Sequence, residues 1–139
     1  MLNQTSPAEK SRCIKLYTNA DVKAGQPVKV GAITGTAISA EDADGYTVVD
    51  TGKEASFKHS VRNVMTYNGG TEATYAAETQ GKRVYYDASS TMPAGTYLST
   101  SPLDKDGNAN EKFGKVLTYG LTTATEKTEA DVNVIQDNA

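Results

Sequence analysis

The sequence predicts an all-β protein: a small antiparallel β-barrel or sandwich of short strands with one short helix, preceded by an extended N-terminal arm. Two observations carry this prediction. Short segments rich in Val, Ile, Thr and Tyr recur along the chain, and clusters of Gly, Pro, Asn, Asp and Ser separate them, as is typical of strands joined by turns. The composition, with 12 Gly, 8 Tyr, 2 Phe and no Trp in 139 residues, favours many turns over long helices.

The clearest hairpin lies at residues 21–38, DVKAGQPVKVGAITGTAI. A Gly-Gln-Pro turn precedes residues 28–30, which alternate apolar and polar side chains as a half-buried strand does. Gly31 interrupts the pattern, and residues 33–38 resume it with β-branched side chains. Gly35 lies inside this second strand, which indicates a bulge or a close approach of another backbone.

The same pattern returns later in the chain, stretched by an insertion. The matched segments are 25–30 with 81–86, 35–38 with 114–117, and 46–50 with 131–135. Two interpretations stay open. The chain contains an internal duplication, or it contains two similar hairpins within one sheet, because turn chemistry alone produces weak self-similarity.

The remaining elements follow in order, and we expect neighbouring strands to form an antiparallel meander. A short helix with Thr71 as its N-cap is predicted at residues 71–79. The expected strands besides the two hairpins are 13–17, 46–51, 55–58, 61–67, 96–100, 113–119 and 132–135.

The length of 139 residues predicts one domain, which we place at residues 12–139, after a flexible arm at residues 1–11. The net charge is −3, with acidic and basic residues interspersed, which argues against a nucleic-acid partner. Cys13 is the single cysteine, so the fold does not depend on an internal disulfide. The arm lacks the apolar run of a signal peptide and no stretch is long enough to span a bilayer, so we expect no membrane partner and synthesis in the cytoplasm.

The chain lacks the motifs of nucleotide-binding proteins. A phosphate-binding loop needs Gly at its first position and Ser or Thr after the Gly-Lys pair. Gly52-Lys53 is followed by Glu54, Gly81-Lys82 is followed by Arg83, and neither has the first glycine. We therefore predict no cofactor.

The acidic loop at residues 104–108 does not fit an EF-hand, which has Gly at its sixth position and Glu at its twelfth. Counted from Asp104, Gly107 is fourth and Lys115 is twelfth. The favoured interpretation is a hairpin tip with Asp-Gly turn chemistry, and a non-standard calcium loop is the alternative. We predict no metal site.

No catalytic residue is predicted either. The single histidine, His59, is the candidate base, and Cys13 is the candidate nucleophile. A lone histidine at a strand end is expected at the surface, and a lone cysteine is expected to be inert and buried. The tyrosines allow two interpretations, an interface or the core itself with hydroxyls at the surface.

Four runs of spaced residues suggest a family. They are Asp21-Val22-x-Ala24-Gly25-x-Pro27-Val28-x-Val30-Gly31-x-Ile33-x-Gly35-x-Ala37, Gly81-x-x-Val84-Tyr85-Tyr86-Asp87, Phe113-Gly114-x-Val116 and Ala130-Asp131-Val132-Asn133-Val134. Together they resemble the phage capsid cement proteins, also called decoration proteins, some of which carry a RecA/RadA-like recombinase label. The resemblance covers residues 12–136. The missing phosphate loop argues against a recombinase, and the arm and residues 92–110 are additions to that family's compact form.

The resemblance implies a non-enzymatic virion protein that binds the outer surface of an expanded icosahedral phage head and stabilises it. The implied partners are the major capsid protein and further copies of the chain, as a homotrimer on the capsid, after synthesis in the host bacterial cytoplasm. Multivalency strengthens weak contacts, and an arm or an added strand would supply them. The expected interaction residues are Leu2, Pro7, Arg12, Ile14, Leu16, Tyr17, Leu103 and Asp104.

Two other classes of function remain as alternatives. A head-fibre or tail adaptor module would require a fused or co-assembling fibre, and the chain has no collagen-like or coiled-coil repeat. A carbohydrate-binding or hydrolytic β-domain would use paired carboxylates and stacking aromatics. The absence of Trp leaves little stacking surface for sugars.

Overall fold

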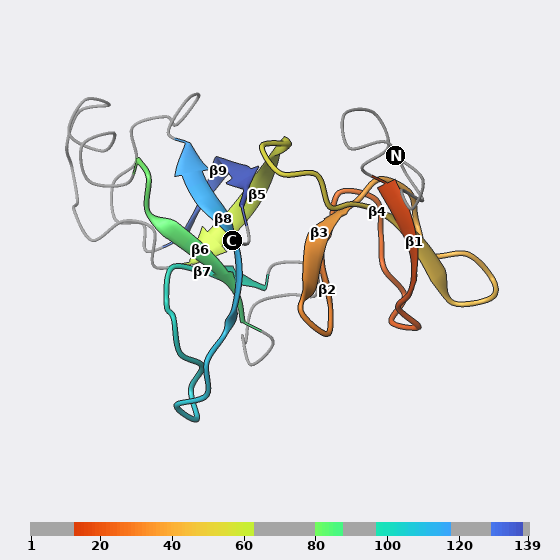
Figure 1. The fold of residues 1–139 in the computed structure, drawn as a ribbon, viewed down its shortest axis with the longest axis horizontal. Helices are drawn as coiled ribbons and strands as arrows, with labels where there is room; N and C mark the ends of the chain where they lie inside the picture. The colour runs from red at the N-terminus through yellow and green to blue at the C-terminus, as the bar shows by residue number, and fades with distance from the viewer. Residues whose placement is uncertain (1–12, 63–79, 88–96, 118–128, 138–139) are drawn as a thin grey trace, which may run out of the picture.

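The structure is a computed structural model that describes residues 13–62, 80–87, 97–117 and 129–137. Within these ranges the chain forms nine strands and no helix, which confirms the all-β prediction for this part of the protein. The strands form two groups that lie side by side along the longest axis of the molecule (Figure 1). They are β1 (Cys13–Tyr17), β2 (Pro27–Val30), β3 (Ile33–Ala37), β4 (Tyr46–Asp50), β5 (Ser56–Arg62), β6 (Arg83–Tyr86), β7 (Leu98–Ser99), β8 (Glu111–Leu117) and β9 (Glu129–Gln136).

The first unit is a four-stranded antiparallel sheet in the order β1-β4-β3-β2. β2, β3 and β4 follow one another, whereas residues 18–26 carry the chain from β1 past the end of the sheet. The expected meander therefore holds for β2, β3 and β4 but not for β1, and the four strands have Greek-key order. The reason is that β1 pairs with β4 along its whole length, from Cys13 with Asp50 to Tyr17 with Tyr46, and turns its aliphatic side chains towards the core.

Gly35 allows β3 and β4 to approach closely, as the sequence predicts. A Cβ atom at this position would lie 2.4 Å from the carbonyl oxygen of Asp50 and 2.7 Å from Cγ1 of Val49. Both distances are shorter than van der Waals contact, so any side chain at residue 35 would push the two strands apart.

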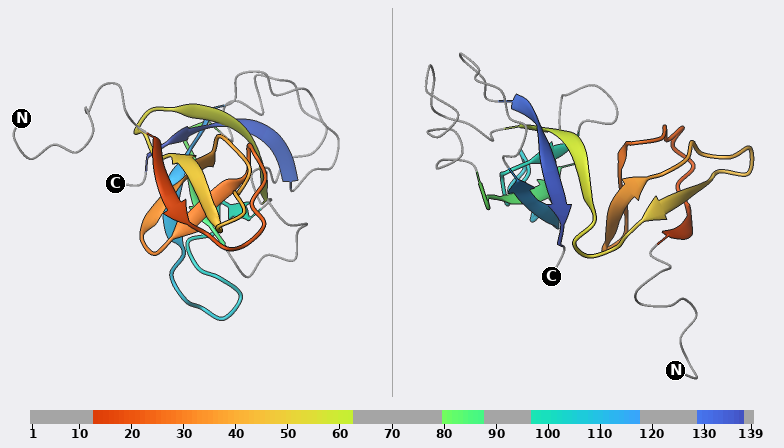
Figure 2. Two further views of the ribbon diagram at one scale, coloured as in Figure 1. Left: turned by 90° about the vertical axis from the view of Figure 1, so that its right-hand side faces the viewer. Right: turned by 90° about the horizontal axis from the view of Figure 1, so that it is seen from above.

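The second unit is a closed five-stranded barrel in the order β5-β7-β6-β8-β9. Figure 2 shows this unit beside the four-stranded sheet. β5 and β9 pair from Ser56 with Ile135 to Arg62 with Glu129. The sequence predicted two strands at residues 55–58 and 61–67, but β5 is continuous from Ser56 to Arg62. The predicted break between them is wrong, because His59 and Val61 both point inward on alternate positions of one strand, and residues 63–67 of the second predicted strand lie outside the described residues.

The two units repeat one arrangement of strands. In the barrel, β5, β9, β8 and β6 are neighbours in the same order as β1, β4, β3 and β2. The matched hairpins also share a backbone hydrogen bond. The N–H of Gly25 donates to the carbonyl of Ala37 at 2.7 Å, and the N–H of Gly81 donates to the carbonyl of Val116 at 2.8 Å.

The second in-strand glycine behaves like the first. A Cβ atom at Gly114 would lie 2.1 Å from the carbonyl oxygen of Ile135, on the strand that corresponds to β4. The pairs Val28–Gly35 and Val84–Gly114 occupy the same place in the two hairpins. The hairpins lie in different sheets, so the alternative of two hairpins within one sheet is wrong, and the chain contains a structural repeat.

Each unit has its own apolar core. The core of the first unit contains Val22, Val28, Ala37 and Val49, with Leu16 and Val30 packed against it. The core of the barrel contains Val61, Val84, Leu98, Phe113, Val116, Val132 and Val134, with Tyr86 packed against it. The core interpretation of the tyrosines holds for Tyr86, which packs on the core of the barrel, whereas Tyr17 and Tyr46 are exposed.

A buried polar network joins the units. The side chain of Gln136 on β9 donates to the backbone carbonyls of Asp50 and Gly52, each at 3.0 Å. With both amide hydrogens used, its Oε1 accepts the hydroxyl hydrogen of Thr36 at 2.7 Å. The Thr36 oxygen lies 2.9 Å from Nε2 of His59. Because the Thr36 hydroxyl donates its hydrogen to Gln136, its oxygen accepts from His59, which is the neutral Nε2–H tautomer.

The predicted helix at residues 71–79 and the predicted arm at residues 1–11 lie outside the described residues. The remaining strands agree with their predictions to within a few residues, which is the usual uncertainty of strand ends.

Candidate interaction surface

The structure divides the predicted interaction residues of β1 between two faces. Tyr17 is 55% exposed, whereas Ile14 and Leu16 are half-buried, and Leu16 packs on the first core. This alternation agrees with the predicted strand. Leu2, Pro7 and Arg12 lie outside the described residues.

The outward side of β1 and β4 carries an exposed surface with two tyrosines, which we call the tyrosine face. Direct cross-strand partners project from the same side of a sheet, and this places Lys15 beside Val48 and Tyr17 beside Tyr46. Ile38, whose N–H donates to the carbonyl of Val48 at 3.0 Å, extends the row. The tyrosine face therefore consists of Lys15, Tyr17, Ile38, Tyr46 and Val48.

Side-chain contacts fix the tyrosine face in position. The rings of Tyr17 and Tyr46 meet edge to face, with centroids 5.2 Å apart. Lys15 Nζ lies 5.6 Å from the centre of the Tyr46 ring and 3.5 Å from the carboxylate of Asp42. Gly45 lies under Tyr17, where a Cβ atom would be 2.9 Å from Cε1 of the ring. These aromatic side chains are exposed and yet held in place.

Leu103 and Asp104 lie at the second predicted contact region. Leu103 is 50% exposed and forms an isolated bridge with Ala109. The carboxylate of Asp104 accepts the backbone N–H groups of Asp106 and Asn108, both at 2.9 Å. This is the predicted hairpin tip with Asp-Gly turn chemistry. No group of three or more His, Cys, Asp or Glu that could hold a metal ion occurs among the described residues.

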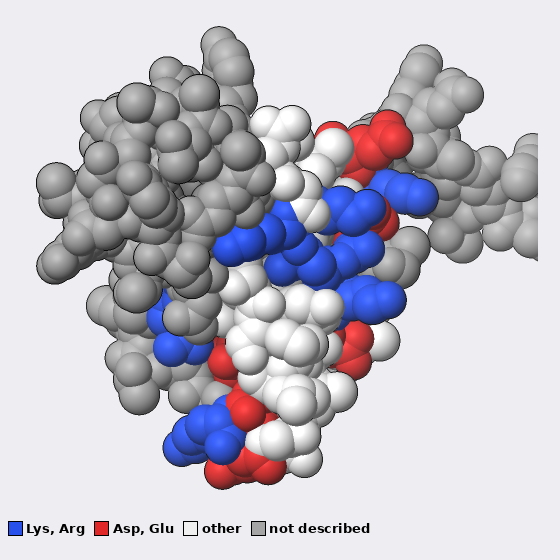
Figure 3. All heavy atoms as spheres, turned by 90° about the vertical axis from the view of Figure 1, so that its left-hand side faces the viewer, with Lys and Arg blue, Asp and Glu red and all other residues white. Residues whose placement is uncertain are grey.

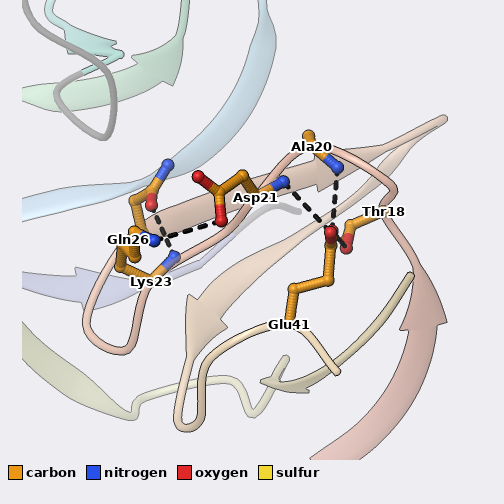
Figure 4. Close-up of polar contacts among 6 residues, drawn as sticks. All are labelled: Thr18, Ala20, Asp21, Lys23, Gln26 and Glu41. Carbon is orange, nitrogen blue, oxygen red and sulfur yellow. Dashed lines mark hydrogen bonds and ion pairs between the residues drawn. The ribbon is translucent and has the colours of Figure 1, made fainter. Parts of the chain in front are cut away.

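Glu41 organises the loop that connects β1 to β2 (Figure 4). Its carboxylate accepts the hydroxyl of Thr18, the N–H of Ala20 at 2.8 Å and the N–H of Asp21 at 3.1 Å. These donors, the Thr18 hydroxyl first, lower the pKa of Glu41 below its usual value. The contacts hold Asp21 at a positive φ of 53°, which is unusual for a residue with a side chain.

A cleft of about 520 Å³ lies between this loop, strand β2 and the barrel. Val22, Pro27 and Val28 form part of its wall on one side, and Tyr86 and Tyr97 form the other. The two tyrosine rings lie with centroids 5.6 Å apart. Burial, together with Tyr97, raises the pKa of Tyr86 to about 12, so its hydroxyl stays protonated and is a hydrogen-bond donor.

Cys13 and His59 differ from their predicted environments. Cys13 is exposed on β1, while His59 is buried between Thr36 and the ring of Phe113, whose centroid lies 5.4 Å from that of the imidazole. The prediction treated each as an isolated residue, but the strand alternation places His59 inward and Cys13 outward. Burial lowers the pKa of His59 to about 4.

Charged side chains are unevenly distributed on the barrel side of the molecule. Figure 3 shows Lys and Arg side chains gathered in a band across the described part of this face. Strand pairing on the barrel sets Arg83 opposite Lys115, and Asp137 lies beside both. Its carboxylate is 3.3 Å from Lys115 Nζ, and its backbone carbonyl accepts a hydrogen bond from the Arg83 guanidinium. These contacts within the chain offset the repulsion between the two positive charges.

No protein-family model, no curated protein and no solved structure matches the chain. Among the described residues no helix has the length and apolar character needed to cross a bilayer.

Sequence reasoning missed three features: the exposed Tyr46, the loop fixed by Glu41 and the cleft. A signal for Tyr46 was present, because alternation along residues 46–50 sets it opposite to Thr47 and Val49. The other two features depend on contacts between residues far apart in the sequence, and no local pattern predicts them.

Proposed function

We propose that the chain is a structural virion protein, a decoration protein that binds the outer surface of an expanded icosahedral phage head and stabilises it. The observation that carries this proposal is the tyrosine face. Tyrosines that are already fixed lose little side-chain entropy on docking, and tyrosine is among the residue types enriched at protein interfaces.

The major capsid protein is the proposed partner, with further copies of the chain bound nearby. The tyrosine face lies on the first unit, and β1 is an edge strand of its sheet. Many such contacts on one shell reinforce one another through their effective concentration, even if each is weak.

Co-sedimentation of the purified protein with expanded and unexpanded capsids of its own phage tests this proposal. We expect saturable binding to expanded shells. Replacing both tyrosines (Tyr17→Ser and Tyr46→Ser) should weaken binding by about ten-fold or more, since anchoring aromatic residues dominate interfaces.

Ile33→Ser is the matched control. Ile33 is 40% exposed, as Tyr46 is, but it lies on β3 next to the hairpin turn, outside the tyrosine face. Binding of this variant should equal that of the unmodified protein. Absence of binding to either shell would refute the proposal, and a complex with a fibre protein instead would favour the adaptor alternative.

A further inference from the structure

The two repeated units differ in one element, strand β7. In the barrel, β7 lies between β5 and β6, parallel to β5 and antiparallel to β6, and closes the sheet. It comes from the long connection between β6 and β8. The matching connection in the first unit, between β2 and β3, is a turn at residues 31–32. The first unit therefore has no strand of its own for this position.

The repeat locates the position that corresponds to β7. Residues Leu98 and Ser99 of β7 pair with Val61 on β5 and Tyr85 on β6, respectively. In the repeat, β1 corresponds to β5 and β4 corresponds to β9, and the registers of these two pairs place Thr18 at the position of Val61. The matched hairpins place Lys29 at the position of Tyr85. Thr18 and Lys29 both line the cleft. The cleft thus occupies the place in the first unit that β7 fills in the barrel.

The backbone of β2 is open towards this cleft. Val30 and Ile33 flank a two-residue turn, so they form the hydrogen-bonded pair that closes the hairpin. By alternation, the N–H and C=O groups of Lys29 point away from β3. β2 is the edge of the four-stranded sheet, so on this side it has no strand partner among the described residues. The next outward position is Pro27, which lacks an N–H, so an added strand would be as short as β7.

Residues 18–26 do not take the place of a strand. Val22 covers the core of the first unit, but its carbonyl accepts the N–H of Glu41 at 2.9 Å instead of pairing with β1 or β2. The segment is fixed in this path by the carboxylate of Glu41. The cleft therefore persists beside β2.

The sequence before β1 resembles β7 in its pattern. In β7, the fully buried Leu98 is followed by the short polar residues Ser99 and Thr100. Leu2 is likewise followed by the polar run Asn3-Gln4-Thr5-Ser6, which Pro7 ends. A segment of this kind can place one leucine in the cleft and pair briefly with β2.

The geometry excludes this pairing within one chain. A strand in the position of β7 runs parallel to β1, as β7 runs parallel to β5. A crossover between adjacent parallel strands takes about a dozen residues or more. Residues 7–12 are too short for it, so the segment has to come from another molecule.

We propose that the cleft beside β2 is a strand-acceptor site, and that it binds the N-terminal segment, residues 1–12, of a second copy of the chain. Leu2 of that copy takes the place that Leu98 takes in the barrel. This inference goes beyond the decoration role and does not depend on it, because it concerns the protein without a capsid.

The test uses a variant that lacks residues 1–11 and a fluorescent synthetic peptide of residues 1–12. We expect the peptide to bind the truncated variant, measured by fluorescence anisotropy. Ala20→Trp in that variant should weaken binding by about ten-fold or more, because it fills the cleft. Ala24→Trp, the same change in the same loop outside the cleft, should leave binding within about two-fold.

The peptide and the full chain provide two further checks. A peptide with Leu2→Asp should not bind, since it replaces the apolar side chain by an ionised carboxylate that is costly to bury. Light scattering should give the full chain a mass above the 14.7 kDa monomer at high concentration, and the truncated variant the mass of a monomer. Circular dichroism spectra confirm that each variant is folded.

Three results would overturn the inference: no peptide binding, equal binding to the two Trp variants, or equal association of the full and truncated chains. Binding to capsids is measured separately on the full chain. A protein that binds expanded shells but not the peptide would keep the proposed function and refute the strand-acceptor site.

Discussion

Thr36→Val tests the network that joins the two units. The hydroxyl of Thr36 donates to Oε1 of Gln136 at 2.7 Å and accepts from Nε2 of His59 at 2.9 Å. Val has nearly the same shape, so the change removes both bonds and leaves a buried donor and a buried acceptor. Each unsatisfied buried group costs about 1–3 kcal/mol, and we expect a loss of about 2–4 kcal/mol in the free energy of unfolding.

Thr36→Ser is the control for this prediction. It keeps the hydroxyl and removes one buried methyl group, which costs about 1 kcal/mol. Urea unfolding at neutral pH, followed by circular dichroism with comparison of the m-values, measures both variants. A Val variant as stable as the Ser variant would show that the two hydrogen bonds do not hold the junction together.

Three further predictions concern other parts of the fold. The folded-state pKa of His59 is about 4, below its usual 6.5. Stability should therefore fall by roughly 3 kcal/mol as the pH decreases from 6.5 to about 4, because the unfolded chain binds the proton first. His59→Gln should reduce this pH dependence of the free energy of unfolding in urea titrations at a series of pH values. Gly35→Ala and Gly114→Ala should each lower the free energy of unfolding by about 2 kcal/mol or more, because their Cβ atoms would lie 2.4 and 2.1 Å from backbone carbonyl oxygens. Gly107→Ala is the control: its Cβ atom would meet no atom within 4 Å, so it should cost only the backbone strain of about 1 kcal/mol in the same assay. Glu41→Ala should speed amide hydrogen exchange at residues 20 and 21, which lose their acceptor, and unchanged exchange there would refute the role given to this carboxylate.

Much of the fold was predictable from local sequence. Turn residues and the alternation of apolar and polar side chains located the hairpin of β2 and β3. The glycine inside its second strand, Gly35, indicated the close approach of a neighbouring strand. The weak sequence similarity between the two halves reflects a structural repeat, because the pairs Val28–Gly35 and Val84–Gly114 occupy the same place in the two hairpins.

The sequence did not predict which strands pair. β1 passes β2 and β3 to join β4, and β5 joins β9, so the sheet order depends on contacts between distant residues. For the same reason the candidate site was only partly predictable. Tyr17 was expected among the interaction residues, and it is exposed, whereas the buried position of His59 follows from the tertiary pairing of β5.

Gln136, at the end of the last strand, has a consequence for the order of events during synthesis. The four strands of the first unit lie within residues 13–50, so this sheet can pair while the ribosome is still translating the rest of the chain. The barrel cannot close until Ser56 meets Ile135, and the junction also needs Gln136. The amino-terminal sheet is therefore expected to form first, and the two halves lock together only when the carboxyl-terminal strand has emerged.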